Sequence, residues 1–128
     1  MRNLLLIGVL GGAGTLLRYW VSGYFARHWG ETFPAGTLAV NLAGCFVIGF
    51  LYYVLTERVL LAPEMRTALL IGLLGGFTTF SSFGLQAFTL LREGEVLAAS
   101  LYVAISNVAG ILLVAAGYTL SREVVKPW

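Results

Sequence analysis

The chain has 128 residues, of which 59% are hydrophobic and 11% charged, and its formal net charge at pH 7 is +2. Soluble domains usually carry about a quarter charged residues, so this composition indicates a protein whose solvent is the lipid bilayer. The small net charge, without any basic cluster, gives no indication of nucleic-acid binding. The single cysteine, Cys45, excludes a disulfide within one chain.

Four stretches are long and apolar enough to cross a membrane, which takes roughly 20 apolar residues. They run from about residue 3 to 25, 34 to 55, 66 to 91 and 96 to 120. We therefore expect an all-α membrane protein with four transmembrane helices, forming one integral domain over residues 1–128 in the cell membrane. The N-terminal run is similar to a signal peptide, but the hydrophobicity continues as far as Phe25, so we interpret it as a retained first span.

Basic residues are unevenly distributed over the two sides of the membrane that four spans imply. The side that holds both termini carries Arg2, Arg58, Arg66, Arg122 and Lys126, and the other side carries Arg27 and Arg92. This favours cytoplasmic termini by the positive-inside rule. The difference is small, however, and a chain that inserts in both orientations has the same small bias, so the orientation stays open.

The first span contains a pair of small residues and a charge. Gly8 and Gly12 lie four residues apart, as Gly72 and Gly76 do in the third span, and such pairs let helix backbones approach closely in lipid. Arg18 lies within the span. Its guanidinium either extends to the membrane interface or supplies positive potential that attracts anions at the mouth of a vestibule.

The second and fourth spans carry uncharged polar residues on one helical face each. Thr37 and Asn41 share a face of the second span, and Tyr102, Ser106 and Gly110 share a face of the fourth. An asparagine in a membrane helix either bonds a neighbouring helix or meets a ligand, and a serine can also bond its own helix. Together the two faces could line a narrow polar track.

The third span contains the stretch GGFTTFSS, from Gly75 to Ser82. Gly75 and Gly76 weaken a helix, and Thr78 and Thr79 add little helix propensity, so we expect this helix to be broken near its middle. Backbone groups freed by a break at membrane depth must be buried in protein or face water or an ion. Two such breaks that meet across a two-fold axis would direct several carbonyls at one cation.

Aromatic residues follow this predicted break. Phe80 and Phe83 lie three residues apart on one helical face, beside Ser81 and Ser82. The edge of an aromatic ring carries partial positive charge, so ring edges and hydroxyls could guide a small anion. The alternative is that both phenylalanines contact lipid.

The predicted spans contain no carboxylate, and the single histidine, His28, falls in the first loop. Metal-dependent hydrolysis, nucleophilic triads and proton carriage by an embedded carboxylate are therefore not supported. Four helices are too few to enclose a polar path by themselves. We expect a homo-oligomer, most simply a dimer.

Three segments, GGAGTLLRY, PAGTLAVNLAG and GLLGGFTTFSSFG, together resemble the fluoride channels of the Fluc (CrcB) family. The resemblance implies an antiparallel, dual-topology homodimer with two fluoride pathways along the subunit interface. It also implies passive, electrogenic export of fluoride from the cytoplasm, which confers fluoride resistance. The protein is then a channel and not an enzyme, and its partners are fluoride, sodium, a second copy of itself and the lipid bilayer.

The resemblance also implies roles for individual residues. The fluoride pathway is expected to comprise Phe80, Phe83, Asn41, Thr79, Ser81, Tyr102, Ser106 and, at the vestibule, Arg18. We add Thr37 to the pathway because it shares a helical face with Asn41. The backbone carbonyls of Gly75 and Thr78 are expected to hold a structural sodium ion at the dimer centre. Gly110 stands where a further hydroxyl is expected, which leaves the far end of the polar track open.

Two other functions remain as alternatives from the sequence. A small proton-coupled multidrug-type exporter also has four short spans, although the absence of a carboxylate in the predicted spans argues against it. A membrane scaffold without transport activity would use the glycines for packing only.

Overall fold

The computed structural model describes residues 2–30, 32–58 and 61–125, and within these ranges all regular secondary structure is helical. The first two spans are α1 (Arg2–Trp29) and α2 (Ala35–Tyr53), which continues as the π-helical η1 (Val54–Arg58). The third span runs through α3 (Pro63–Thr67), the π-helical η2 (Ala68–Leu74), α4 (Gly75–Phe77) and α5 (Phe80–Arg92), and the fourth is α6 (Val96–Val124). These four stretches are long and apolar enough to cross a membrane, which confirms the predicted all-helical membrane fold.

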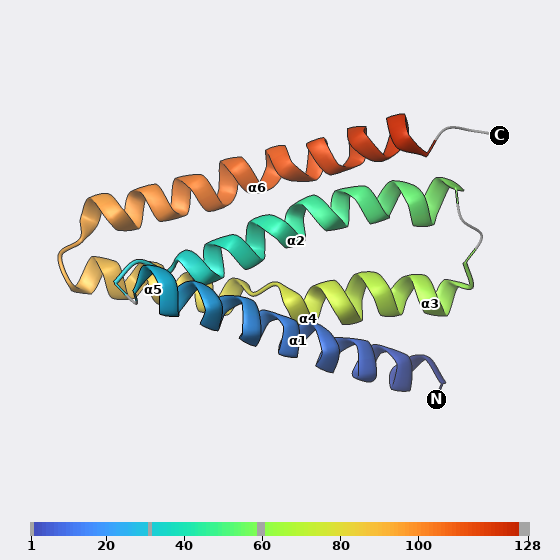
Figure 1. Ribbon diagram of the computed structural model, residues 1–128, viewed down its shortest axis with the longest axis horizontal. Helices are drawn as coiled ribbons and strands as arrows, with labels where there is room; N and C mark the ends of the chain where they lie inside the picture. The colour runs from blue at the N-terminus through green and yellow to red at the C-terminus, as the bar shows by residue number, and fades with distance from the viewer. Residues whose placement is uncertain (1, 31, 59–60, 126–128) are drawn as a thin grey trace.

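Both termini lie at one end of the helical bundle, together with α3 (Figure 1). We call this the terminal end, and we call the opposite end, where α1 connects to α2 and α5 to α6, the loop end. Of the basic residues predicted on the side of the termini, Arg2, Arg58, Arg66 and Arg122 fall in helix ends or short helices there. Lys126 lies outside the described residues.

The helices extend beyond the predicted span limits. The second continues to Arg58, the third begins at Pro63 and the fourth ends at Val124. As a result Glu57, Glu64 and Glu123, which the predicted limits leave outside the spans, lie in helical structure near the helix ends.

Backbone contacts between glycines hold α1 against the third span. Gly72 packs on Ile7 and Gly11, and a side chain at Gly76 would overlap the carbonyl oxygen of Gly11. The Gly72–Gly76 pair therefore packs as a small-residue face does in lipid, where no hydrophobic drive brings helices together. On α1, however, the contact uses Gly11 and Gly14 instead of the predicted pair Gly8 and Gly12, which meets nothing within 4 Å of a Cβ position.

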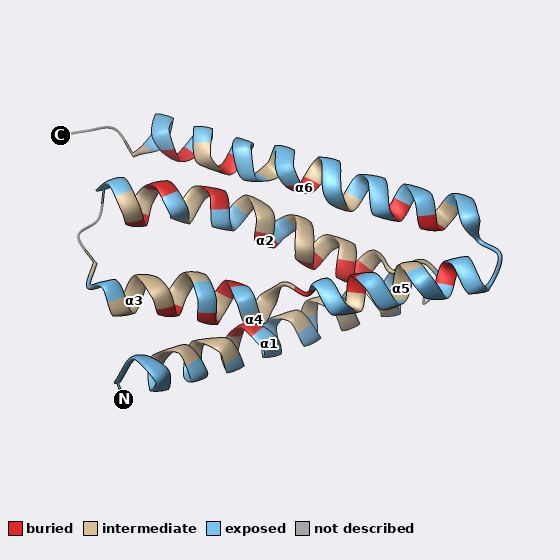
Figure 2. Cartoon of the chain, turned by 180° about the vertical axis from the view of Figure 1, so that it is seen from behind, coloured by how far each residue is buried: buried red, intermediate tan, exposed pale blue. Residues whose placement is uncertain are grey.

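Helices α2 and α6 form the most extensive helix pair, and they also approach through glycine. Gly49 of α2 lies against the backbone of Val114, and Gly117 of α6 lies against the backbone of Phe46 and Phe50. Buried residues follow the facing sides of the helices, and the outer sides are exposed over most of their length (Figure 2). The exposed sides carry large apolar side chains, as expected for helices whose outer surface meets lipid.

Candidate functional site

The third span is interrupted at Thr78 and Thr79, whose backbones are extended. Thr78 has φ −84° and ψ 160°, and Thr79 has φ −151° and ψ 120°. Gly75 and Gly76, which the sequence places at the break, lie within α4. Gly76 packs directly against α1, whereas a Cβ at Gly75 would meet nothing within 4 Å, and the interruption falls on the threonines that follow.

Each threonine closes one of the two half-helices. The backbone N–H and the hydroxyl of Thr78 both donate to the carbonyl of Leu74, at 2.9 Å each. The Thr79 hydroxyl oxygen accepts from the backbone N–H of Ser82 at 3.2 Å, and the Thr79 O–H donates to the Ser82 hydroxyl oxygen at 3.1 Å. Thr79 is therefore the N-cap of α5, because a side-chain oxygen there satisfies an amide that has no helical partner.

Side chains from two other helices hold the backbone of the break. Asn41 of α2 accepts from the Thr79 N–H at 2.8 Å and donates to the Thr79 carbonyl at 3.0 Å. Arg18 of α1 donates to the Thr78 carbonyl at 3.4 Å. Polar backbone groups at membrane depth require such partners. Asn41 thus bonds a neighbouring helix, which is one of the two roles that the sequence offered for it. The Arg18 side chain points inward to the break instead of extending to the interface.

This bonding pattern removes the helical partners of two particular carbonyls. In a continuous helix the Gly75 carbonyl would accept from the Thr79 N–H, and the Thr78 carbonyl would accept from the Ser82 N–H. Here the Thr79 N–H donates to Asn41, and the Ser82 N–H donates to the Thr79 hydroxyl. The carbonyls of Gly75 and Thr78 therefore lose their helical partners, and these are the two carbonyls expected to bind sodium.

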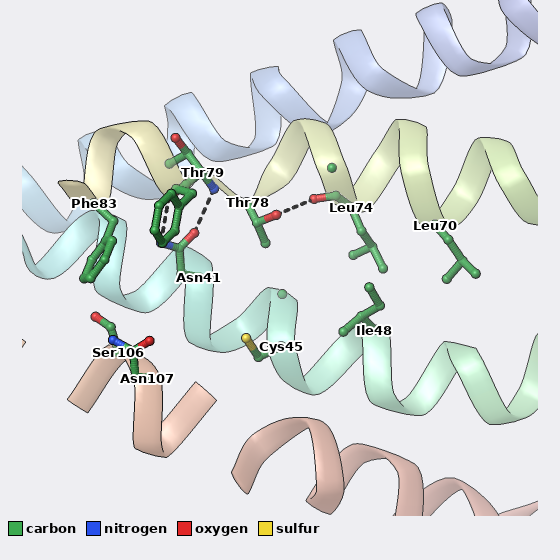
Figure 3. Close-up of a pocket in the computed structure, with 13 residues that line it drawn as sticks. Asn41, Cys45, Ile48, Leu70, Leu74, Thr78, Thr79, Phe83, Ser106 and Asn107 are labelled. Carbon is green, nitrogen blue, oxygen red and sulfur yellow. Dashed lines mark hydrogen bonds between the residues drawn. The ribbon is translucent and has the colours of Figure 1, made fainter. Parts of the chain in front are cut away.

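A groove of about 340 Å³ opens beside the break. Seven of the predicted site residues line it: Asn41, Gly75, Thr78, Thr79, Phe80, Phe83 and Ser106. Asn41 points from α2 toward the break, and Ser106 and Asn107 come from the part of α6 beside Phe83 (Figure 3). The remaining predicted residues, Thr37, Ser81, Tyr102 and Arg18, do not line this groove.

The structure also shows the surroundings of several α2 and α6 residues at the groove, which the sequence could not predict. The buried hydroxyl oxygen of Ser106 has no hydrogen-bond partner within the described part of the chain, so it has bonding capacity left for a ligand. Asn107 and Cys45 also line the groove. Gly110 does not: it is buried against α2, and a Cβ there would lie 3.4 Å from the Cys45 sulfur.

Phe80 and Phe83 are neighbours with opposite exposure. Their ring centroids lie 5.4 Å apart, but Phe80 is 82% exposed whereas Phe83 is 9% exposed. Phe83 in turn contacts the Tyr102 ring at 5.3 Å. In a single chain the two predicted pathway phenylalanines therefore have different surroundings: one lies in the core, and the other projects from the surface beside the groove.

Tyr102 links this aromatic pair to a polar residue that the sequence analysis missed. Its ring is fully buried, and its hydroxyl donates to the side-chain oxygen of Gln86 at 3.0 Å. Thr37, which is also buried, lies beside the same hydroxyl. Gln86 follows Phe83 by three residues, so its position on the same face of α5 was an available signal.

Comparison with known proteins agrees with this architecture. Residues 5–118 match the family model described as CrcB-like protein, Camphor Resistance (CrcB). The chain is 48% identical over 112 residues to a protein from Pseudomonas putida named fluoride-specific ion channel FluC, covering 88% of this chain and 90% of that one. Proteins of the same name are 45% identical over 115 residues in Aquifex aeolicus (89% and 93% of the two chains) and 43% identical over 125 residues in Rhizobium etli (98% and 100%).

Proposed function

The chain belongs to the CrcB family, and we propose that it is a fluoride-selective channel that exports fluoride passively and electrogenically from the cytoplasm. It is a multi-pass membrane protein with four helices long enough to cross a bilayer. Within the structure of this chain, the observation that supports the proposal is the groove beside the interrupted third span. There, uncharged donors and aromatic rings gather at one place within the membrane.

The groove suits an anion that must lose water as it enters. Ser106 offers a buried hydroxyl without a partner, and the exposed Phe80 ring and the buried Phe83 ring border the same space. Hydroxyl hydrogens and ring edges present partial positive charge without a full charge that would trap the ion. Arg18, bound to the break from behind, adds positive potential near the site.

We propose that two copies assemble as an antiparallel homodimer and that each groove is completed by the partner. Phe80, Ser81 and Asn107 are exposed in the single chain, although they lie in the interior of membrane-spanning stretches. A polar side chain exposed to hydrocarbon is unfavourable, so Ser81 and Asn107 support a protein partner on this face. A second copy seated here would enclose the groove and leave two pathways along the interface.

We further propose that the carbonyls of Gly75 and Thr78 from both copies hold a structural sodium ion. Both carbonyls lack their helical partners, and the Thr78 carbonyl, which accepts from Arg18 at 3.4 Å, has a second lone pair. Gly75 lines the groove, where a Cβ would meet nothing within 4 Å. Backbone carbonyls are the ligands that monovalent cation sites in channels use. The ion would neutralise converging carbonyl dipoles and so stabilise the centre of the dimer.

Flux from proteoliposomes tests the proposed function. We expect purified protein to release fluoride rapidly when a potassium ionophore supplies counter-ion, to be indifferent to a pH gradient and to release no chloride. Fluoride release that requires a proton gradient would identify an exporter instead. A folded, reconstituted protein without fluoride release would leave only a scaffold role.

A further inference from the structure

Four aromatic rings form a continuous row from the loop end to the break. Phe33, in the connection between α1 and α2, contacts Tyr102 at 5.7 Å between ring centroids, with the rings at 80°. Tyr102 contacts Phe83 at 5.3 Å, and Phe83 contacts Phe80 at 5.4 Å. Three of these rings were singled out from the sequence. The fourth, Phe33, has no role assigned in the pathway described above.

Tyr102 lies between two of these rings and is held at three places. Phe33 packs edge-on against one part of its ring, Phe83 packs against another, and its hydroxyl donates to Gln86. The side chain has no exposed surface. The orientation of the hydroxyl therefore depends on both flanking phenylalanines, and only Phe33 comes from outside the membrane helices.

The backbone bonds around Phe33 place this residue at the start of α2. Its carbonyl accepts from the Ala35 N–H at 2.7 Å, and Pro34 accepts from the Leu38 N–H at 3.1 Å, so the residue leads directly into the first turn of α2. The same helix carries Asn41, which binds the break. Phe33 thus lies directly before the helix that carries the Asn41 clamp.

We infer that Phe33 is a positioning residue of the anion pathway, an inference that rests on the proposed fluoride-channel function. Its ring holds Tyr102 with the tyrosine hydroxyl on Gln86, and Tyr102 in turn packs against Phe83, so that the Phe83 ring keeps its position in the wall of the groove. An aromatic ring is required because the contact is edge-on, a geometry that an aliphatic side chain of similar volume does not reproduce. The alternative is that Phe33 only stabilises the fold, by covering the core cluster that contains Phe83 and Tyr102.

A double-mutant cycle separates these two roles. Fluoride release is measured from proteoliposomes holding the full-length wild type, Phe33→Leu, Tyr102→Phe and the double variant, with chemical crosslinking to monitor the oligomer. We expect Phe33→Leu and Tyr102→Phe each to slow release by about tenfold, and the double variant to match Tyr102→Phe within about twofold. Phe33→Tyr should restore release to within about twofold of wild type, because the ring is retained.

The matched control is Phe88→Leu. Phe88 is an exposed phenylalanine of α5 outside the row, so its replacement should leave fluoride release unchanged. If Phe33→Leu does not assemble, Phe33→Met takes its place in the cycle. Additive losses in the double variant, or release by Phe33→Leu equal to wild type, overturn the inference while the channel proposal stands. Absence of fluoride release from the wild type itself overturns the proposed function, and the inference with it.

Discussion

Asn41 and Thr79 exchange two hydrogen bonds across the interface between α2 and the break: the Thr79 N–H donates to the asparagine oxygen at 2.8 Å, and the asparagine amide donates to the Thr79 carbonyl at 3.0 Å. The carboxamide takes the place of a peptide group and satisfies the backbone of the most extended residue in the third span. One of its two amide hydrogens remains available to a ligand. A single side chain can therefore hold the break and border the groove.

We predict that Asn41→Ala lowers the free energy of unfolding by about 3 kcal/mol, because two buried backbone groups lose their partners. Denaturant titration in detergent micelles measures this. Thr89→Ala is the control, since that exposed hydroxyl donates to the Leu85 carbonyl of its own helix and its removal should change stability by less than about 0.5 kcal/mol. Equal effects of the two substitutions would contradict the role of Asn41 at the break.

The N-cap of α5 gives a second, smaller prediction. Thr79→Ala removes the hydroxyl that accepts from the Ser82 N–H, and we expect a loss of about 1 kcal/mol. Thr79→Ser keeps the oxygen and should remain within a few tenths of wild type. Thermal unfolding of both variants checks this, and equal stability of the two would show that the cap contributes nothing.

Packing of α1 predicts opposite outcomes for two glycines two residues apart. Gly14→Ala places a Cβ against the backbone of Leu73 and Phe77, which should destabilise the fold by roughly 1–3 kcal/mol. Gly12→Ala meets nothing within 4 Å and should be neutral, or stabilising by up to about 1 kcal/mol through helix propensity. Unfolding measurements on the pair decide the matter; a larger loss from Gly12→Ala would mean that the outer face of α1 is occupied in the assembly.

The unequal exposure of the two phenylalanines predicts separable effects on flux and stability. Phe80→Ile and Phe83→Ile should each reduce fluoride release by about tenfold, because both lose a ring edge at the groove. Only Phe83→Ile should also lower the stability of the fold, since Phe83 is buried against Tyr102 whereas Phe80 is exposed. Unchanged release in both variants would remove the aromatic rings from the transport mechanism.

Sodium is expected to stabilise the proposed dimer. A ligand at about a hundred times its dissociation constant stabilises the state that binds it by about 2.7 kcal/mol, so replacing sodium with N-methyl-D-glucamine should lower the thermal stability of the dimer. Crosslinking yield and thermal unfolding, each with and without sodium, measure the effect. Identical behaviour in both buffers, with no sodium detected in the purified protein by elemental analysis, would exclude the cation site.

The sequence by itself determined the membrane fold and the region of the interruption. Four long apolar stretches define the spans through composition alone, because transfer into lipid depends on the sum of local side-chain contributions. The run GGFTTFSS placed weak helix formers and hydroxyls together in the third span. Cap-forming residues act within one turn of the chain, so their effect can be predicted locally.

Only the tertiary structure decided which groups meet. The break falls on Thr78 and Thr79, after Gly76, which packs on α1. That contact uses Gly11 and Gly14 of α1, which the sequence did not distinguish from Gly8 and Gly12. The roles of Gln86 and Phe33 likewise depend on where α6 places Tyr102. Hydropathy has no direction around a helix that is apolar on every side, so the rotation of each helix is set by backbone contact and hydrogen bonding with its neighbours.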